Sequence, residues 1–162
     1  MAVFYPDKTD KTNLILILRK TYRGVHSNQV GFPGGRLEIF DKNLKHTALR
    51  ETEEEVGIPK AEVQVVKRLT RLYIPPSNFW VYPYVGLLEN TPRLIAQETE
   101  VEKILEVNID ELLDDRNLIQ QKLSTSYAEN IEVPAFSLNG QVVWGATAMM
   151  LSELKELLKE VL

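Results

Sequence analysis

Two segments with apolar residues at helical spacing, separated by strand-length apolar stretches, constrain the fold of this chain most. The first helical segment, residues 43–56, ends where Gly57 and then Pro59 follow it, and the second occupies residues 146–162. A short acidic helix is predicted at residues 110–115. The strand-like stretches are 2–5, 14–19, 62–72, 79–88 (interrupted by Pro83), 101–107, 132–138 and 141–144. Strands flanked by two substantial helices predict an α/β sandwich with a mixed β-sheet.

The length of the chain, 162 residues, is ordinary for one domain, so residues 1–162 are expected to form a single domain. The chain begins almost directly in a strand-like stretch, which suggests that an upstream segment has been lost. No apolar run approaches the roughly 18 residues of a membrane-spanning helix, and no export signal precedes the first strand. We therefore expect no membrane partner and a cytoplasmic location.

Charge and side-chain chemistry limit the partners and the kinds of metal site. The 23 acidic residues outnumber the 19 basic ones, and the resulting net charge of −4 argues against a nucleic-acid partner. The absence of cysteine excludes thiolate zinc sites and cysteine nucleophiles. His26 and His46 are too few for a multi-histidine centre. A metal site in this chain must therefore be built mostly from carboxylates.

A cluster of glutamates near the end of the first helix is the strongest chemical signal. Glu51, Glu54 and Glu55 stand at positions i, i+3 and i+4 and share one helical face, while Glu53 points elsewhere. Like charges at this spacing repel, and the helix dipole disfavours anions in the last turns. A hard divalent cation such as Mg²⁺ or Mn²⁺ would supply the counter-charge, whereas the alternative is a solvated acidic face.

The loop before this helix, Phe32, Pro33, Gly34 and Gly35, lets the backbone come close to a phosphate or a metal. Loop and helix together, residues 35–58, resemble the Nudix box, Gly-x5-Glu-x7-Arg-Glu-U-x-Glu-Glu-x-Gly-U, where U is aliphatic. The matching residues are Gly35, Arg50, Glu51, Glu54, Glu55, Gly57 and Ile58. There are three departures: Asp41 replaces the first Glu, eight residues instead of seven separate it from Arg50, and Thr52 occupies an aliphatic position.

The extra residue and the aspartate resemble the coenzyme A diphosphatase branch of that family. Residues 34–41 and 47–51 are similar to its box, Gly-Gly-Lys-x-Glu-x-x-Asp followed by Thr-Ala-Leu-Arg-Glu. Residues 16–35 resemble its upstream signature, Leu-x-x-Arg followed by His-x-Gly-Gln-x-x-Phe-Pro-Gly-Gly. Asn28 replaces a glycine of that signature, and because Asn tolerates left-handed backbone, the turn can be kept.

The resemblance implies a Nudix-like α/β/α sandwich and a site for Mg²⁺ or Mn²⁺. It makes Glu51, Glu54 and Glu55 metal ligands, with the carbonyl of Gly35 as a further ligand. It also implies that Arg50 orients the glutamates through an ion pair, which its i−4 spacing from Glu54 permits. In this family the cations neutralise the diphosphate and make the attacking water more acidic.

The general base comes in this family either from the box or from a later loop. In the loop, Glu98 and Glu100 are candidates and Glu100 is preferred, with a solvated strand end as the alternative. Arg19 and Arg36 are the candidate cations for the substrate phosphates, with Arg71 behind them, although any of the three can be a plain surface arginine.

The upstream signature adds two further candidates for substrate binding, His26 and Gln29. His46 is expected on the surface of the helix. The aromatic residues Trp80, Tyr82, Tyr84 and Trp144 are capable of stacking on adenine, but aromatic side chains in strands are usually core, and these four are therefore left out of the candidate site.

These resemblances predict hydrolysis of the diphosphate of coenzyme A or acyl-CoA to 3′-phospho-AMP and (acyl-)4′-phosphopantetheine. One alternative keeps the chemistry on another nucleoside diphosphate derivative, such as an ADP-sugar or a dinucleotide. A second alternative is a nucleotide-binding Nudix module without catalysis, which the intact Arg50 and glutamates disfavour. The sequence leaves the oligomeric state open, a homodimer included.

Overall fold

The computed structural model describes residues 1–21, 28–125 and 128–162. Its elements in chain order are β1 (Ala2–Pro6), β2 (Thr12–Arg19), β3 (Val30–Gly31), α1 (Leu44–Val56), β4 (Gln64–Arg68), β5 (Leu72–Ile74), η1 (Pro75–Ser77), β6 (Phe79–Val81), β7 (Tyr84–Leu87), β8 (Val101–Asn108), α2 (Ile109–Leu113), η2 (Asp115–Asn117), β9 (Leu118–Thr125), β10 (Ala128–Leu138), β11 (Gln141–Trp144) and α3 (Gly145–Lys159).

The main sheet is mixed, as the sequence predicts. Strands β1 and β7 run parallel, whereas β1 with β2, β2 with β3 and β8, and β4 with β7 pair antiparallel. Strand β2 is central in this sheet. It pairs with β8 along one edge, and along the other edge it pairs first with β1 and then with β3. Its almost continuous burial matches the apolar run from Leu14 to Leu18.

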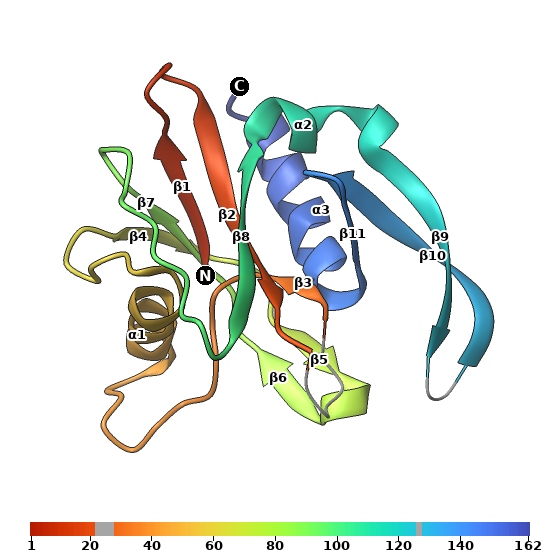
Figure 1. Ribbon diagram of the computed structural model, residues 1–162, viewed down its shortest axis with the longest axis horizontal. Coiled ribbons are helices and arrows are strands. Elements are labelled where there is room, and N and C mark those ends of the chain that lie inside the picture. Colours follow the sequence, from red (N-terminus) through yellow and green to blue (C-terminus); the bar gives the residue numbers. More distant parts are fainter. Residues whose placement is uncertain (22–27, 126–127) are drawn as a thin grey trace.

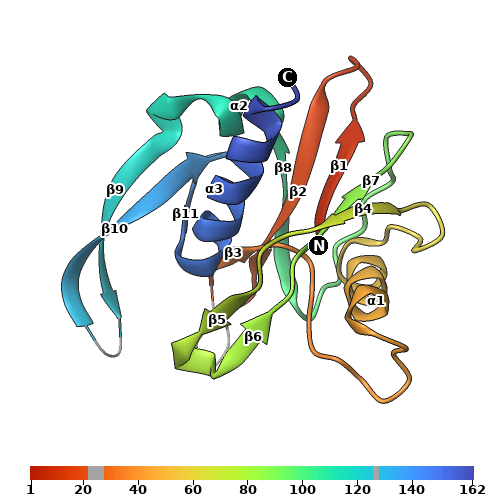
Figure 2. The ribbon, with the colours of Figure 1, turned by 180° about the vertical axis from the view of Figure 1, so that it is seen from behind.

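Each face of the main sheet is covered by one long helix (Figures 1 and 2). Side chains alternate along a strand, so Ala2 and Phe4 join the core on the α3 side. Val3 and Tyr5 join the core on the α1 side, with Ala48 and Val56 of the helix. The predicted α/β/α sandwich is therefore confirmed.

Helix α1 occupies almost the predicted range, and both of its ends are capped. The side chain of Asn43 accepts a hydrogen bond from the backbone N–H of His46 at 3.0 Å. Gly57 takes a left-handed conformation, φ 76°, and its N–H bonds to the carbonyl of Glu53 at 3.0 Å. The glutamate-rich turns thus lie at a well-defined helix end.

The predicted strand over residues 62–72 is confirmed for β4 but wrong beyond Arg68, because the chain leaves the main sheet there. The N–H of Leu69 bonds to the carbonyl of Pro83 at 3.0 Å, and the chain between them forms the separate β5–β6 hairpin. The stretch 79–88 likewise divides into β6 and β7 on either side of Pro83, where the interruption was predicted.

A second sheet, β9–β10–β11, was predicted only in part. The turn at Asn139 and Gly140 joins β10 to β11 as expected, but β10 begins at Ala128 and β9 was missed. The polar run of Gln120, Gln121 and Lys122 gives β9 no apolar alternation to identify it.

Helix α3 lies between the main sheet and this second sheet (Figure 1). It ends at Lys159, so the prediction of a helix to residue 162 is wrong, and Val161 is 76 % exposed and not on the apolar side. Over the described ranges, none of the helices combines the length and the apolar character that a membrane span requires.

Candidate active site

The glutamates of α1 are arranged as the helical spacing predicts. Glu55 is buried, Glu51 has a side chain only 13 % exposed, and the side chain of Glu54 is 53 % exposed. Glu53 turns away and pairs with the ammonium of Lys60 at 3.2 Å. Glu55, Glu51 and Glu54 therefore share one face of the helix, and the exposure of their side chains increases in that order.

Arg50 is the cation that holds two of these carboxylates. Its Nη1 donates to Glu51 Oε1 and to Glu54 Oε2, each at 2.9 Å, which includes the predicted i, i+4 contact. Its Nη2 donates to the carbonyl of Arg36 at 3.0 Å. The guanidinium thus connects the glutamate face to the loop that precedes the helix.

Asp41 anchors the other side of the Arg50 guanidinium, a role that the sequence reasoning missed. Its side chain is fully buried and accepts bonds from Arg50 Nε at 3.1 Å and Nη2 at 2.9 Å. It also accepts from Thr47 Oγ1 at 3.0 Å and lies 3.3 Å from His46 Nδ1. These hydrogen bonds, those from Arg50 above all, hold the pKa of Asp41 well below its usual range. The sequence signal for this role was the position of Asp41, which stands where the motif has its first glutamate.

His46 is therefore not the simple surface residue that was predicted. Its side chain is 35 % exposed, because the imidazole contacts the carboxylate of Asp41.

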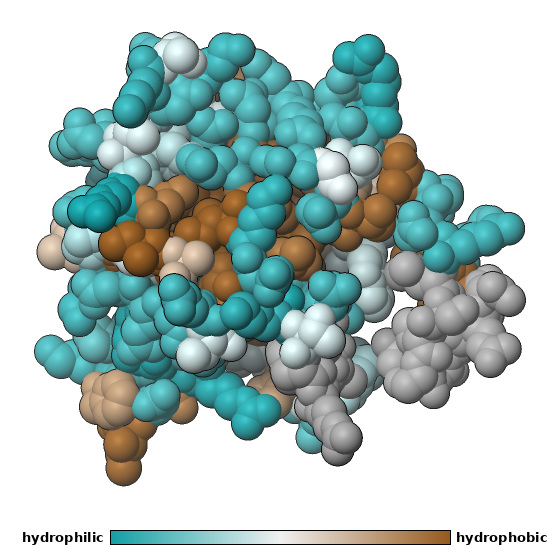
Figure 3. All heavy atoms as spheres, in the orientation of Figure 1, coloured by the Kyte–Doolittle hydropathy of each residue, from teal (hydrophilic) through white to brown (hydrophobic). Residues whose placement is uncertain are grey.

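The loop that contains Asp41 also exposes an apolar tip, visible as brown spheres at the lower left of Figure 3. Leu37, Ile39 and Phe40 form this tip, and Ile39 is fully exposed. Asp41, immediately after it, points inward.

Glu55 joins the glycine loop to β2. Its Oε2 accepts a bond from the N–H of Gly34 at 2.7 Å, and its Oε1 accepts one from Arg19 Nη1 at 3.0 Å. Arg19 Nη2 also donates to the carbonyl of Gly34 at 2.8 Å. Burial raises the pKa of Glu55, and the neighbouring Arg19 charge opposes that rise.

Gly35 lies directly against the carboxylate of Glu51. A Cβ at this position would lie 2.3 Å from Glu51 Oε1 and 2.4 Å from its Cδ. Only glycine therefore allows the loop to approach this closely. Burial raises the pKa of Glu51 against the attraction of Arg50, and the charges of Glu54 and Glu100 add to the rise.

Glu100 lines a hollow together with Arg19, the arginine that bonds to Glu55 of this cluster. Its backbone is held by hydrogen bonds: its N–H donates to Gln97 Oε1 at 2.9 Å, and its carbonyl accepts from the N–H of Lys20 at 2.9 Å. The side chain is exposed and lines a hollow of about 380 Å³ together with Arg19, Lys20, Thr21 and Thr99. The hollow places a carboxylate and two cationic residues side by side.

The other predicted substrate residues have different surroundings. The guanidinium of Arg36 lies 4.5 Å over the ring of Phe79, and that of Arg71 lies 4.7 Å over Trp80. The carbonyl of Gln29 accepts the N–H of Arg19 at 3.0 Å. His26 lies outside the described residues.

Two expectations about the upstream signature and the aromatic residues have clear outcomes. Asn28 has φ 54°, so it keeps the left-handed conformation predicted for the position of the missing glycine. Trp80 is 51 % exposed, so the expectation that an aromatic side chain in a strand belongs to the core is wrong for this residue. The reason is that β6 belongs to the separate hairpin and not to the main sheet.

The donor set of the cluster fits a hard divalent cation in its chemistry. Glu51, Glu54 and Glu55 offer carboxylate oxygens, and the absence of a side chain at Gly35 leaves the loop backbone beside Glu51. Within residues 1–21, 28–125 and 128–162, however, no three acidic or histidine side chains converge on one point. Each of the three glutamates instead faces a guanidinium, Arg50 or Arg19.

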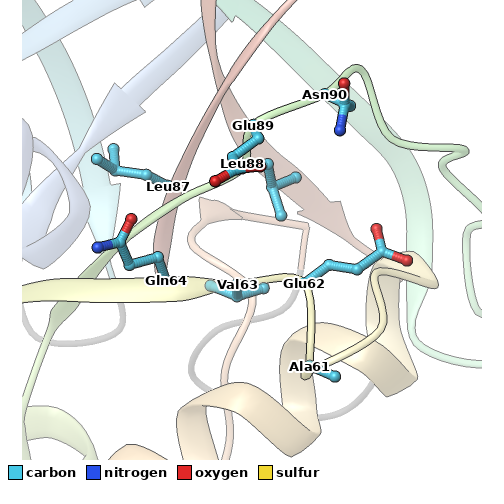
Figure 4. A pocket seen from close by; sticks show the side chains of 8 residues that line it. All are labelled: Ala61, Glu62, Val63, Gln64, Leu87, Leu88, Glu89 and Asn90. Carbon is cyan, nitrogen blue, oxygen red and sulfur yellow. The ribbon is translucent and has the colours of Figure 1, made fainter.

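A larger hollow, of about 490 Å³, lies elsewhere, at the ends of β4 and β7 (Figure 4). Its lining consists of Ala61, Glu62, Val63, Gln64, Leu87, Leu88, Glu89 and Asn90. This lining includes two glutamates but no arginine, lysine or predicted site residue. It therefore lacks the cations that would attract a diphosphate.

Comparison with known proteins agrees with the site. The sequence matches the NUDIX domain family over residues 1–127. It is 35 % identical over 146 residues to the Nudix hydrolase NudL of Photorhabdus laumondii, covering 90 % of this chain and 77 % of that one. The NudL of Yersinia enterocolitica is 34 % identical over 150 residues, with coverage of 88 % and 72 %.

Solved structures share the fold at low sequence identity. The Nudix hydrolase RenU of M. smegmatis has a TM-score of 0.68 at 12 % identity, over 99 % of this chain and 84 % of its own. The NUDIX domain of Shewanella oneidensis NrtR, solved with ADP ribose, has a TM-score of 0.53 at 16 % identity, over 69 % and 71 %. The chain belongs to the Nudix family and is a hydrolase that acts on the diphosphate bond of nucleoside diphosphate derivatives.

Proposed function

We propose that this Nudix hydrolase cleaves the diphosphate of coenzyme A or its acyl derivatives. The products are 3′-phospho-AMP and (acyl-)4′-phosphopantetheine. The substrate class is suggested by the upstream signature of residues 16–35, which resembles that of the coenzyme A diphosphatase branch. Free coenzyme A and acyl-CoA share the bond that is cleaved, so both belong to this proposal.

The observation that carries the proposal is the pair of bonds from Arg19. This arginine closes the first part of the upstream signature, and it donates to Glu55 at 3.0 Å and to the carbonyl of Gly34 at 2.8 Å. Its own N–H bonds to the carbonyl of Gln29, in the second part of the signature. Residues that distinguish this branch in sequence thus contact the glutamate cluster itself.

We propose that Glu51, Glu54 and Glu55, with the carbonyl of Gly35, hold Mg²⁺ or Mn²⁺. Such a cation, when bound, supplies charge neutralisation on the phosphates and a more acidic water molecule. Arg50 keeps Glu51 and Glu54 in place through the bonds already described. Because Arg50 is itself held by Asp41, the carboxylates are oriented before any substrate arrives.

In this proposal Glu100 is the general base. It accepts a proton from the water whose oxygen attacks phosphorus, while the bond from phosphorus to the bridging oxygen breaks. The effect of its charge on Glu51 and its place beside Arg19 and Lys20 support this role. Arg36 and Arg19 supply positive charge for phosphate oxygens, and Gln29 and His26 complete the proposed substrate contacts.

A panel of substrates tests the proposal. Purified protein with Mn²⁺ or Mg²⁺ is given coenzyme A, acetyl-CoA, a long-chain acyl-CoA, dephospho-coenzyme A, ADP-ribose and a diadenosine polyphosphate, and the products are identified by mass spectrometry. We expect a coenzyme A compound to have the highest kcat/KM, by about tenfold or more. A higher value for ADP-ribose or the dinucleotide would assign the enzyme to the alternative substrates. Binding of coenzyme A with no turnover of any compound would indicate a binding module.

A further inference from the structure

Arg36 is held by an aromatic ring from another part of the chain. Its guanidinium lies 4.5 Å from the centroid of the Phe79 ring, within the range of a cation–π contact. Arg36 follows Gly35 directly, and its carbonyl accepts Arg50 Nη2 at 3.0 Å, so its backbone is tied to the glutamate cluster. Among the described residues, no acidic side chain forms an ion pair with Arg36.

This arrangement matters because carboxylates lie close by. An arginine beside Glu51 and Glu54 is expected to be drawn toward them, and fewer of its N–H donors would then face a substrate. Arg50 already donates a hydrogen bond to one carboxylate oxygen of each of these glutamates. A ring under the planar guanidinium restricts the side chain to one region and leaves its N–H donors free at the edges.

The β5–β6 hairpin determines which aromatic residue faces Arg36. Tyr73 pairs with Trp80 across the hairpin, and Ile74 pairs with Phe79. Because neighbouring residues in a strand point to opposite sides, Phe79 and Trp80 lie on different faces. Trp80 meets Tyr73, at a centroid distance of 5.4 Å, and Arg71 instead.

We propose that Phe79 is a positioning residue, which holds the Arg36 guanidinium where a phosphate of the substrate docks. The inference rests on the proposed function, in which Arg36 binds the substrate, and it adds the element that orients this arginine. The β5–β6 hairpin thereby forms part of the rim of the active site. The contact is expected to act on substrate binding and not on the chemical step, since the Phe79 ring holds Arg36, a proposed substrate-binding residue, and not a proposed metal ligand.

Steady-state kinetics of Phe79→Leu tests this role on the best substrate of the panel. Loss of a cation–π contact at an exposed site is expected to raise KM about two- to fivefold, with kcat within about twofold of the wild type. Phe79→Tyr is expected to restore the wild-type KM, because tyrosine keeps the ring. Tyr73→Leu is the matched control: it removes a ring from the same hairpin, where the Tyr73 ring meets Trp80 and not Arg36, and it should leave KM unchanged.

An Arg36→Ala background shows whether the effect passes through Arg36. We expect Arg36→Ala to raise KM by itself and Phe79→Leu to add nothing to it. An equal additional rise in that background would overturn the proposal, as would a similar rise for Tyr73→Leu or no rescue by tyrosine. Thermal unfolding accompanies each variant, and Phe79→Met replaces Phe79→Leu in the same cycle if the latter unfolds. Failure of the proposed function would show in the wild type, as a different preferred substrate, whereas failure of this inference shows only in the variants.

Discussion

The guanidinium of Arg50 donates to both oxygens of the Asp41 carboxylate, from Nε to Oδ1 at 3.1 Å and from Nη2 to Oδ2 at 2.9 Å. The remaining nitrogen, Nη1, donates to Glu51 and Glu54. A two-point contact fixes the plane of a guanidinium as well as its position. The buried aspartate therefore sets the direction from which the two proposed metal ligands are held.

We expect Asp41→Asn to lower kcat/KM by about 10- to 100-fold, the usual cost of removing a group that orients a metal ligand. The amide keeps the shape of the side chain but offers an N–H to Arg50 in place of one acceptor oxygen. Glu38→Gln is the control, because Glu38 is 51 % exposed on its side chain and lies 3.9 Å from the same arginine. Equal losses for both variants would show that Asp41 has no special role.

The glutamates of α1 offer a second test, with its control on the same helix. Glu54→Gln should reduce kcat by about 100-fold or more, because the proposed cation contributes several kcal/mol to transition-state stabilisation. Folding should be retained, since the Glu54 side chain is 53 % exposed. Glu53→Gln should keep full activity, because Glu53 faces Lys60. Activity assays and circular dichroism of both variants decide the matter.

Gly35→Ala tests the close approach of the loop to Glu51. The new Cβ would lie 2.3 Å from Glu51 Oε1, so the carboxylate must swing away, which its flexible side chain allows at little cost to the fold. We expect weaker Mn²⁺ binding in calorimetry and lower kcat with a nearly unchanged melting temperature. Gly31→Ala is the control, since its Cβ meets Thr147 Oγ1 only at an ordinary 3.8 Å. Unchanged Mn²⁺ affinity in Gly35→Ala would argue against Gly35 and Glu51 sharing a cation.

Local signals in the sequence identify α1 and its chemistry well. Asn43 and Gly57 mark the two ends of the helix through their own side-chain and backbone preferences. The spacing of Glu51, Glu54 and Glu55 places them together because a helix has a fixed period. Such features depend on residues within a few positions of one another, so one sequence suffices to predict them.

Features that depend on distant contacts were harder to predict. The motif identifies the position of Asp41, but this residue stands nine positions before Arg50, and only the folded chain brings the two together. The exposure of Trp80 follows from the separation of the β5–β6 hairpin from the main sheet, which the aromatic pattern of the strand does not indicate. Strand β9 depends on pairing with β10, and its polar sequence carries little signal.

The turn between β1 and β2 supplies a prediction about stability and pH. The carboxylate of Asp7 accepts bonds from the N–H and the hydroxyl of Thr9, each at 2.7 Å, and from the N–H of Lys11 at 3.1 Å. These bonds, with the Thr9 hydroxyl foremost, lower the pKa of Asp7 from 3.8 to about 2.

A lowered pKa means that the folded state binds fewer protons than the unfolded state, so this carboxylate stabilises the fold fully above about pH 4. The contribution is lost as the pH falls through about 2, where the folded form becomes protonated. We expect Asp7→Asn to be less stable than the wild type in urea unfolding at pH 7, with the difference shrinking steadily between pH 4 and pH 2. The matched control is Asp10→Asn, because the side chain of Asp10 accepts no hydrogen bond among the described residues. A stability difference between the wild type and Asp7→Asn that stays constant from pH 7 to pH 2 would contradict the assignment of the acid-sensitive stability to this turn.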